Sequence, residues 1–160
     1  MPNIAESLET YTGYVPAFIE STKAVFSTML GWELEVGPTV KCKSFQPGHD
    51  VSGIIGFSGS LRGTVVVSLD KEITFAAAEA FIGARPTVID SDVQDLVAEL
   101  ANMIGGGAKE RIDIDQIALG LPTTIVGHEH QISFNPGVEV ETVRFQSPFG
   151  PLSVQIAIGN

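Results

Sequence analysis

The 160-residue chain is 44% hydrophobic and 18% charged and carries a formal net charge of −10. This length predicts a single domain over residues 1–160, and the composition excludes a disordered chain. Because the nine basic residues are scattered through an acidic sequence, the chain lacks the clustered positive charge of nucleic-acid-binding proteins.

The first residues and the single cysteine indicate where the protein works. Residues 1–10 are polar and acidic and lack the basic and apolar regions of a signal peptide. No apolar run reaches the roughly 18–20 residues that a membrane span needs. Cys42 is the only cysteine, which excludes an intrachain disulfide and favours a reducing compartment. We therefore expect a cytoplasmic protein that does not bind membranes.

The first part of the chain is predicted to form a helix and then three strands. The helix is expected at 15–31 and the strands at 32–45, 51–57 and 61–69. Pro16 suits the first turn of the helix, where its missing N–H costs little. The last two strands predict a hairpin around residues 58–60, because the second of them is rich in β-branched residues.

The second part is predicted to form two helices and then more strands. The first helix is expected at 71–82, and the second begins at Asp90 or Ser91 as its capping residue. The glycines at 105–107 allow two interpretations: the second helix ends or bends there, or small residues let another backbone pack closely. The later strands are expected at 123–126, 130–134, 138–145 and 152–158.

The order of these elements predicts the fold class. The connections between strands are of hairpin length and carry turn residues, which favours antiparallel pairing. Strands and helices are grouped instead of alternating, as in α+β proteins. We therefore expect an α+β fold, a mostly antiparallel sheet with long helices packed on one face.

One stretch of the second predicted helix carries three polar side chains in a row. Asp95, Glu99 and Asn102 stand at i, i+4 and i+7, so at ~100° per residue they fall within an arc of roughly 60°. The aliphatic residues form the opposite, core-facing stripe: Val93, Leu96, Val97, Leu100, Met103 and Ile104. Such a row can bind a cation and hold a water without a metal ligand set. An ordinary solvated helix face has the same pattern.

This row resembles the signature of a known family. Asp95, Glu99 and Asn102, followed by Pro122 at the opening of a strand, resemble the motif of the CheC/CheX/FliY phosphatases, which dephosphorylate the chemotaxis response regulator CheY. The stretch 99–109, with an asparagine, an apolar pair, small residues and a lysine, is similar to the same family. The resemblance implies a CheC/CheX-like fold.

A second feature separates the branches of that family. CheC-type proteins carry the motif twice, whereas the first predicted helix here has Glu20 followed by Lys23 in place of asparagine. Residues 16–31 are also similar to the start of the CheX branch. The chain therefore resembles CheX, which implies a homodimer.

The resemblance also implies roles for the residues of the row. Asn102 would orient the hydrolytic water, and Glu99 would pair with the lysine of the receiver domain. Asp95 and Pro122 would add contacts to the partner, a phosphorylated CheY-like receiver. The chain itself would bind no cofactor and no metal, because Mg²⁺ is carried by the phosphorylated receiver.

Other functions compete with this interpretation. A non-catalytic adaptor could use the same acidic helix face to dock a receiver or a flagellar-motor protein, and a small-ligand sensor would share the architecture. His128-Glu-His130 would place two imidazoles on one face of a strand, as in a metal site. No third ligand lies near them in the sequence, which favours a solvated turn.

Overall fold

Within residues 4–41, 49–112 and 116–159, which the computed structural model describes, helices and strands follow the predicted order. The elements are α1 (Ile4–Leu30), β1 (Glu35–Lys41), β2 (His49–Gly59), β3 (Gly63–Leu69), α2 (Lys71–Ile82), α3 (Ser91–Arg111), β4 (Ile117–Leu119), β5 (Thr123–His130), β6 (Glu139–Ser147) and β7 (Gly150–Ile158). The helix predicted at 71–82 is confirmed at both ends. The part of the first predicted strand beyond residue 41 lies outside the described residues.

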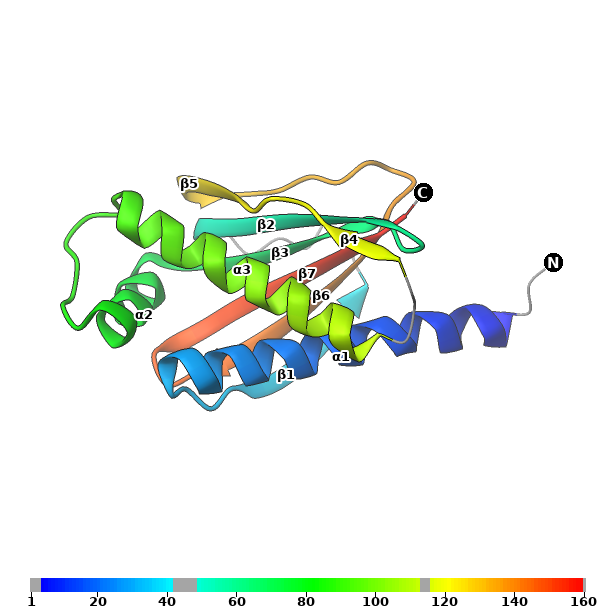
Figure 1. Cartoon of the computed structure of the whole chain (residues 1–160), viewed down its shortest axis with the longest axis horizontal. Helices are drawn as coiled ribbons and strands as arrows, with labels where there is room; N and C mark the ends of the chain where they lie inside the picture. Colours follow the sequence, from blue (N-terminus) through cyan, green and yellow to red (C-terminus); the bar gives the residue numbers. More distant parts are fainter. Residues whose placement is uncertain (1–3, 42–48, 113–115, 160) are drawn as a thin grey trace.

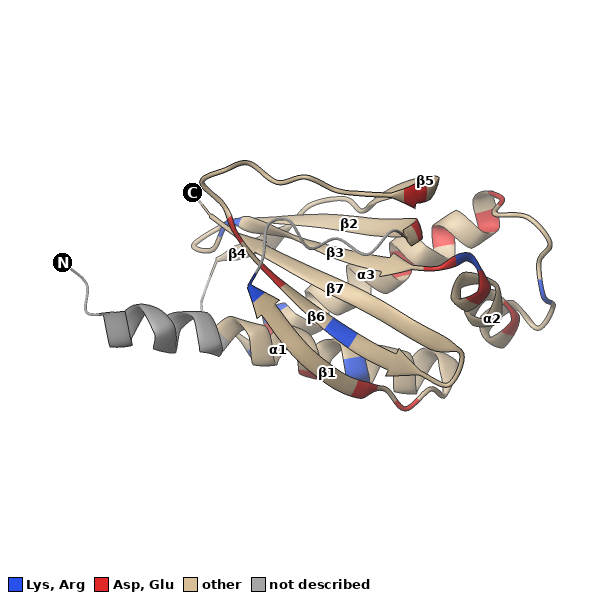
Figure 2. Ribbon diagram, turned by 180° about the vertical axis from the view of Figure 1, so that it is seen from behind, with Lys and Arg blue, Asp and Glu red and all other residues tan. Residues whose placement is uncertain are grey.

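The strands of the described residues form one seven-stranded sheet in which neighbours are antiparallel. Their order is β1-β6-β7-β3-β2-β4, and β5 pairs with β2 on the same side as β4. The long helices α1 and α3 lie across one face of this sheet, and α2 packs against both of them beside the end of the sheet (Figure 1). Figure 2, turned to the opposite side, shows the strands in front of α1 and α3. The predicted α+β fold, with long helices on one face, is confirmed.

The hairpin at the centre of the sheet supplies much of the core. In β2 and β3, Val51 lies opposite Leu69 and Ile55 lies opposite Val65. All four side chains are fully buried between the sheet and the helices. Because successive side chains of a strand point to opposite faces, every second residue of these strands faces the other side of the sheet. That other face carries Ser52 and becomes important below.

The first helix differs from its prediction. α1 begins at Ile4 and runs through Pro16, which was expected in its first turn. Proline has no N–H to donate, so an interior proline removes one helix hydrogen bond and costs about 3 kcal/mol. Pro16 itself lies on the exposed side of the helix. The prediction was wrong because capping rules place proline by local preference alone.

The strand predicted at 130–134 is also wrong. β5 continues to His130, and residues 131–135 form no strand. The pairing of β5 with β2 shifts register near its end, and Glu129 takes a left-handed φ of 48°. The strand ends one residue after this irregularity, at His130, which still pairs with His49, and Ile132 lines a small cavity. Strand β4 was not predicted from the sequence, because a segment of three residues is too short to show an alternation of apolar and polar side chains.

The glycine run at residues 105–107 lies inside α3 and does not end it. The buried hydroxyl of Ser21, on α1, donates to the carbonyl of Ile104 at 2.7 Å, and a Cβ on Gly107 would collide with that hydroxyl. A Cβ on Gly105 would lie 3.2 Å from Cγ2 of Ile55 in β2. The structure therefore supports close packing, the second of the two interpretations.

Replacing the C-cap glycine of α2 is expected to destabilise the protein. Gly83 has φ of +92°, so Gly83→Ala should cost about 1–2 kcal/mol through the left-handed backbone alone, since nothing lies within 4 Å of the added Cβ. Urea unfolding at pH 7.5 measures the change. Gly137→Ala is the control, because that Cβ also meets open space and no positive φ is required. Equal effects of the two changes would contradict the explanation.

Candidate functional site

The site begins with the cap that starts α3. Asp90 is extended and its Oδ1 accepts a hydrogen bond from the backbone N–H of Val93 at 3.0 Å. Gln94 donates from Nε2 to the carbonyl of Ile89 at 3.4 Å. Asp90 is therefore the capping residue, and Ser91 is the first residue of the helix. This cap fixes where each later residue lies around α3.

The three polar residues lie in one row on α3, which we call the acidic row: Asp95, Glu99 and Asn102. Asp95 and Glu99 are exposed and Asn102 is half-buried, while Leu100 and Ile104 on the opposite side are almost fully buried. Within the described residues, no side chain of the row makes a hydrogen bond or an ion pair. The row is thus available to another molecule.

The edge of the sheet runs beside the acidic row. Near the start of α3, the hydroxyl of Thr124 in β5 donates to the carbonyl of Gln94 at 3.3 Å. Further along the helix, Leu119 of β4 lies where a Cβ on Gly105 would touch it at 3.5 Å. The residues between β4 and β5 therefore lie alongside the middle of α3. Pro122, half-buried, is among them and stands directly before the first residue of β5.

An exposed leucine next to this proline was not predicted from the sequence. Leu121 is 91% exposed, more than any other large hydrophobic residue in the described part of the chain. Its position between β4 and β5 places it on the same side of α3 as Pro122. No sequence signal distinguishes it, because a leucine before a proline is expected equally in a core. It adds exposed apolar surface beside the row.

Charge along α3 is divided between its two ends. The first turn carries Asp92, and the last turn carries Lys109 and Arg111. This arrangement suits the helix dipole, whose amino-terminal end is positive. The exposed carboxylates of the acidic row have no basic partner among the described residues, so they favour a partner with a positive group. None of the helices in the described part is long and apolar enough to cross a membrane.

The two histidines considered as a metal pair face different surroundings. His128 Nδ1 lies 3.1 Å from Asp50 Oδ1, and the His128 side chain is 86% exposed. His130 points into a small cavity, where its Nε2 lies 2.6 Å from the hydroxyl of Ser52. Among the described residues, no group of three or more His, Cys, Asp or Glu side chains could hold a metal ion.

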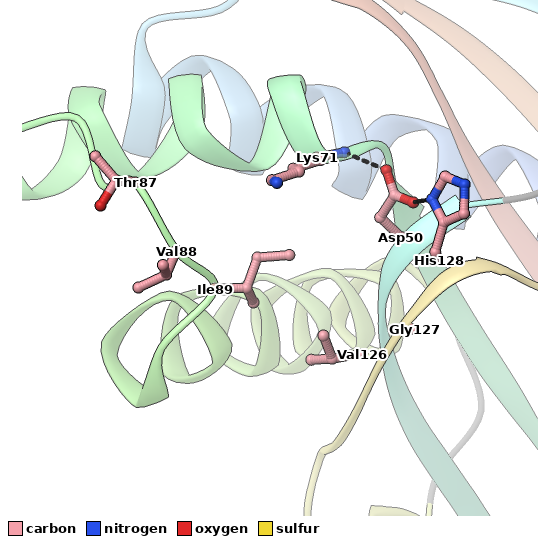
Figure 3. Close-up of a pocket in the computed structure, with 8 residues that line it drawn as sticks. All are labelled: Asp50, Lys71, Thr87, Val88, Ile89, Val126, Gly127 and His128. Atoms are coloured by element: carbon pink, nitrogen blue, oxygen red, sulfur yellow. Dashed lines mark hydrogen bonds and ion pairs between the residues drawn. The ribbon is translucent and has the colours of Figure 1, made fainter.

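A groove of about 300 Å³ opens near the start of α3 (Figure 3). It lies between the residues that lead into α3 and the end of β5, and Asp50 is one of the residues that line it. Burial alone would raise the pKa of Asp50, but the backbone N–H groups of Lys71 and Glu129 and the nearby His128 outweigh it and lower that pKa. Asp50 is thus held as a carboxylate. Sequence reasoning missed this groove, because its walls come from distant segments.

The acidic row itself limits the chemistry that this site can perform. A carboxamide is a poor nucleophile, but its oxygen accepts a hydrogen bond from a water and can aim that water at an electrophile. A carboxylate one turn away can pair with a cation of the partner and fix its position. The row therefore suits a reaction in which the partner supplies the reactive group and this chain orients the water.

The fold is found in known proteins of similar sequence. A CheC-like superfamily protein from Shewanella sp. PV-4 is 27% identical, with a TM-score of 0.86 over 92% of this chain and 98% of its own. Chemotaxis protein CheX from Vibrio vulnificus is also 27% identical, with a TM-score of 0.85 over 91% and 99%. A chain of the CheX–CheY–BeF3–Mg complex from Borrelia burgdorferi is 26% identical, with a TM-score of 0.76 over 92% and 98%.

The sequence also matches a family model. No curated protein matches the chain. The family described as chemotaxis phosphatase CheX matches residues 51–146, which run from within β2 to within β6 and include the acidic row and Pro122. Since this match covers more than half of the sequence, the chain belongs to the chemotaxis phosphatase CheX family.

Proposed function

We propose that this protein hydrolyses the aspartyl phosphate of a CheY-like receiver domain in chemotaxis or related two-component signalling. Membership of the CheX family supports this, as does the similarity to a CheX that is found in a complex with CheY. The observation that carries the proposal is the acidic row, which is open to a partner and bound to nothing within the described residues.

The proposed chemistry uses Asn102 to orient water. The carboxamide oxygen accepts a hydrogen bond from the water, which leaves a lone pair of the water directed at phosphorus. The water oxygen bonds to phosphorus, the bond from phosphorus to the aspartate oxygen breaks, and inorganic phosphate takes up the water proton. Because phosphoryl transfer depends chiefly on positioning and on charge stabilisation, an orienting amide is sufficient.

The other residues of the site position the partner in this proposal. Glu99 pairs with the lysine of the receiver and sets how far Asn102 enters its site. Asp95 and Pro122 make further contacts with the receiver. Mg²⁺ belongs to the phosphorylated receiver, and this chain contributes no metal ligand and no cofactor. To test whether only the receiver supplies the metal, phosphatase activity can be measured with protein freed of metal and receiver loaded with Mg²⁺.

Three further properties belong to the same proposal. The chain acts as a single CheX-like domain, as a homodimer, and in the cytoplasm where receivers are phosphorylated. Sedimentation of the purified protein measures the dimer directly, and a monomer at micromolar concentration would refute it. Limited proteolysis that releases two stable fragments would refute the single domain, and cell fractionation tests the location.

The decisive experiment compares phosphate release from a phosphorylated receiver with and without this protein. A phosphatase accelerates release. A non-catalytic adaptor, the second candidate, binds the receiver or a flagellar-motor protein through the same helix face and leaves the rate unchanged. Binding to a receiver loaded with beryllium fluoride and Mg²⁺ therefore needs to be measured beside the rate.

Charge reversal in the acidic row is expected to weaken binding to the receiver. Glu99→Lys places a cation against the receiver lysine, so affinity should fall at least ~10-fold, about 1.4 kcal/mol. Glu110→Lys is the matched control, because it reverses an exposed carboxylate on the last turn of the same helix. Equal losses in both variants would indicate only long-range electrostatics and would remove Glu99 from the contact.

A further inference from the structure

A buried polar network lies on the sheet face opposite the helices. His49, at the start of β2, is 6% exposed; its Nδ1 lies 3.0 Å from Oδ1 of Asp70, and its Nε2 lies 2.6 Å from the hydroxyl of Ser153 in β7. Asp70 is the N-cap residue of α2, yet its side chain makes no capping hydrogen bond. The Asp70 carboxylate instead accepts a hydrogen bond from His49. The chain positions of His49 and Ser153 differ by 104 residues.

A second imidazole, His130, belongs to a separate set of hydrogen bonds that meets the first set at a shared cavity, and His49 and His130 are directly paired across β2 and β5. His130 Nδ1 lies 2.8 Å from the carbonyl of Gly127, and its Nε2 lies 2.6 Å from the hydroxyl of Ser52. Ser52 in turn lies 2.8 Å from the hydroxyl of Ser68 on β3. Both histidines, all three serines and Gln155 line one cavity of about 10 Å³.

The acceptors place one proton on each ring. The carboxylate of Asp70 and the carbonyl of Gly127 can only accept, so each imidazole carries a proton on Nδ1. When a ring is neutral, its Nε2 is an acceptor, to which the hydroxyl of Ser153 or Ser52 donates, and Ser68 then donates to Ser52. Neutral rings therefore satisfy all of these hydrogen bonds.

The same three side chains in a hydrolase would form a nucleophilic triad, but this geometry excludes that role. Ser153 is 1% exposed, and a cavity of about 10 Å³ has room for about one water and none for a substrate. The two sets of hydrogen bonds instead hold four parts of the chain around this one cavity: the starts of β2 and α2, the middle of β7 and the end of β5. We call His49, Asp70, Ser153, His130 and Ser52 the histidine clasp.

A second set of bonds ties the same elements together from outside. Oδ2 of Asp50 accepts from the backbone N–H of Lys71, which caps α2 in place of Asp70. Oδ1 of Asp50 accepts from the N–H of Glu129, where the backbone has its left-handed φ, and contacts His128. The end of β5 thus rests on the sheet through its contacts to Asp50 and to Ser52.

We propose that the histidine clasp is a proton-operated latch: it is closed while His49 is neutral, and proton uptake by His49 in mild acid releases the end of β5, residues 127–132, which pairs with His49 and lines the same cavity, from the sheet. Release exposes the cavity that Ile132 helps to line and lets water solvate the charged ring. It also changes the groove that Val126, Gly127 and His128 line beside the start of α3. The latch is independent of the proposed phosphatase activity.

The surroundings of His49 favour release when it gains a proton. Burial lowers the pKa of His49, and the hydrogen bond and charge of Asp70 offset this only in part; His130 and Arg144 lower the pKa further. When Nε2 is also protonated, the Ser153 hydroxyl that donates to it in the neutral state has to turn and accept instead. A state in which His49 is solvated binds the proton more readily, so the closed latch loses stability as pH falls from about 6.5 through the lowered pKa.

Nuclear magnetic resonance of the wild-type protein tests the latch, because the chain has only three histidines. At pH 7.5, the nitrogen shifts of His49 and His130 should show the Nδ1–H tautomer for both rings. As pH falls to 5.5, the His49 ring should remain neutral below its ordinary pKa, and its protonation should coincide with loss of the signals of residues 127–132. A His49 ring that is charged at pH 7, or that carries its proton on Nε2, would overturn the proposal.

Hydrogen exchange gives a second measurement. After correction for the intrinsic pH dependence, amides of residues 127–132 should open at least about threefold more often at pH 5.5 than at 7.5, while those of β3 stay unchanged. His128→Gln is the matched control: it removes an exposed imidazole of the same segment and should keep the pH response. Loss of the response in His128→Gln, or equal opening across the whole sheet, would refute a latch built on His49.

Discussion

Asn102→Ala is expected to lose at least ~100-fold of the acceleration of phosphate release while binding to the receiver persists. The carboxamide is half-buried on the exposed side of α3 and makes no bond within the described residues, so its removal should disturb the fold little. The water would then lose the group that orients it. Single-turnover phosphate release at saturating protein measures this rate apart from binding.

Two controls make that experiment specific to the amide. Asn102→Asp keeps the shape of the side chain but adds a negative charge beside the phosphoryl oxygens, so it should be as inactive as the alanine variant. Gln131→Ala removes an exposed carboxamide from a segment outside the row and should leave the rate unchanged. Full turnover in Asn102→Ala would exclude this residue from the mechanism.

Gly107→Ala is expected to lower the free energy of unfolding by about 1–3 kcal/mol, although alanine is the better helix former. The added methyl would collide with the hydroxyl of Ser21, which is fully buried and held by the carbonyl of Ile104. Relief requires the Ser21 hydroxyl to turn away and lose its bond to Ile104, or α1 to move away from α3. Urea unfolding measures the loss, and the same displacement should reduce phosphatase activity through the acidic row.

A double-mutant cycle separates this collision from other effects. Ser21→Ala alone should cost about 0.5–1.5 kcal/mol through the lost hydrogen bond, but Gly107→Ala made in that background should cost much less than in the wild type. Gly106→Ala is the neighbouring control, because its Cβ would meet only Leu119 at an ordinary 3.9 Å and should stabilise the helix. Equal effects of the two glycine changes would contradict the close packing of α1 on α3.

Much of the candidate site was predictable because it depends on short spacings. Asp95, Glu99 and Asn102 share one side of α3 through helix geometry alone, and the aliphatic residues between them define the buried side. The hairpin of β2 and β3 and the ends of α2 follow from β-branched residues and a C-terminal glycine in the same way. These features need only neighbours within a few residues.

Predictions failed where a distant partner decided the outcome. The strand expected at 130–134 instead ends at His130, where Asp50 and Ser52, about 80 residues earlier, bind residues 128–130. No prediction covered the start of α2, where Asp70 holds the N-cap position but His49 interacts with its carboxylate and Asp50 supplies the cap. Local preferences cannot anticipate such exchanges.

The sequence by itself determined the acidic charge, the order of the elements, the α+β class and the row on α3, since periodicity and composition act along the chain. Only the tertiary structure decided that Gly107 serves a helix contact with Ser21, and that Leu121 and Pro122 lie beside the row. It also decided that His49 is hydrogen-bonded to both Asp70 and Ser153 in a buried network. The reason is physical: hydrogen bonds and steric contacts depend on distance in space, which the sequence specifies only after the sheet has brought its strands together.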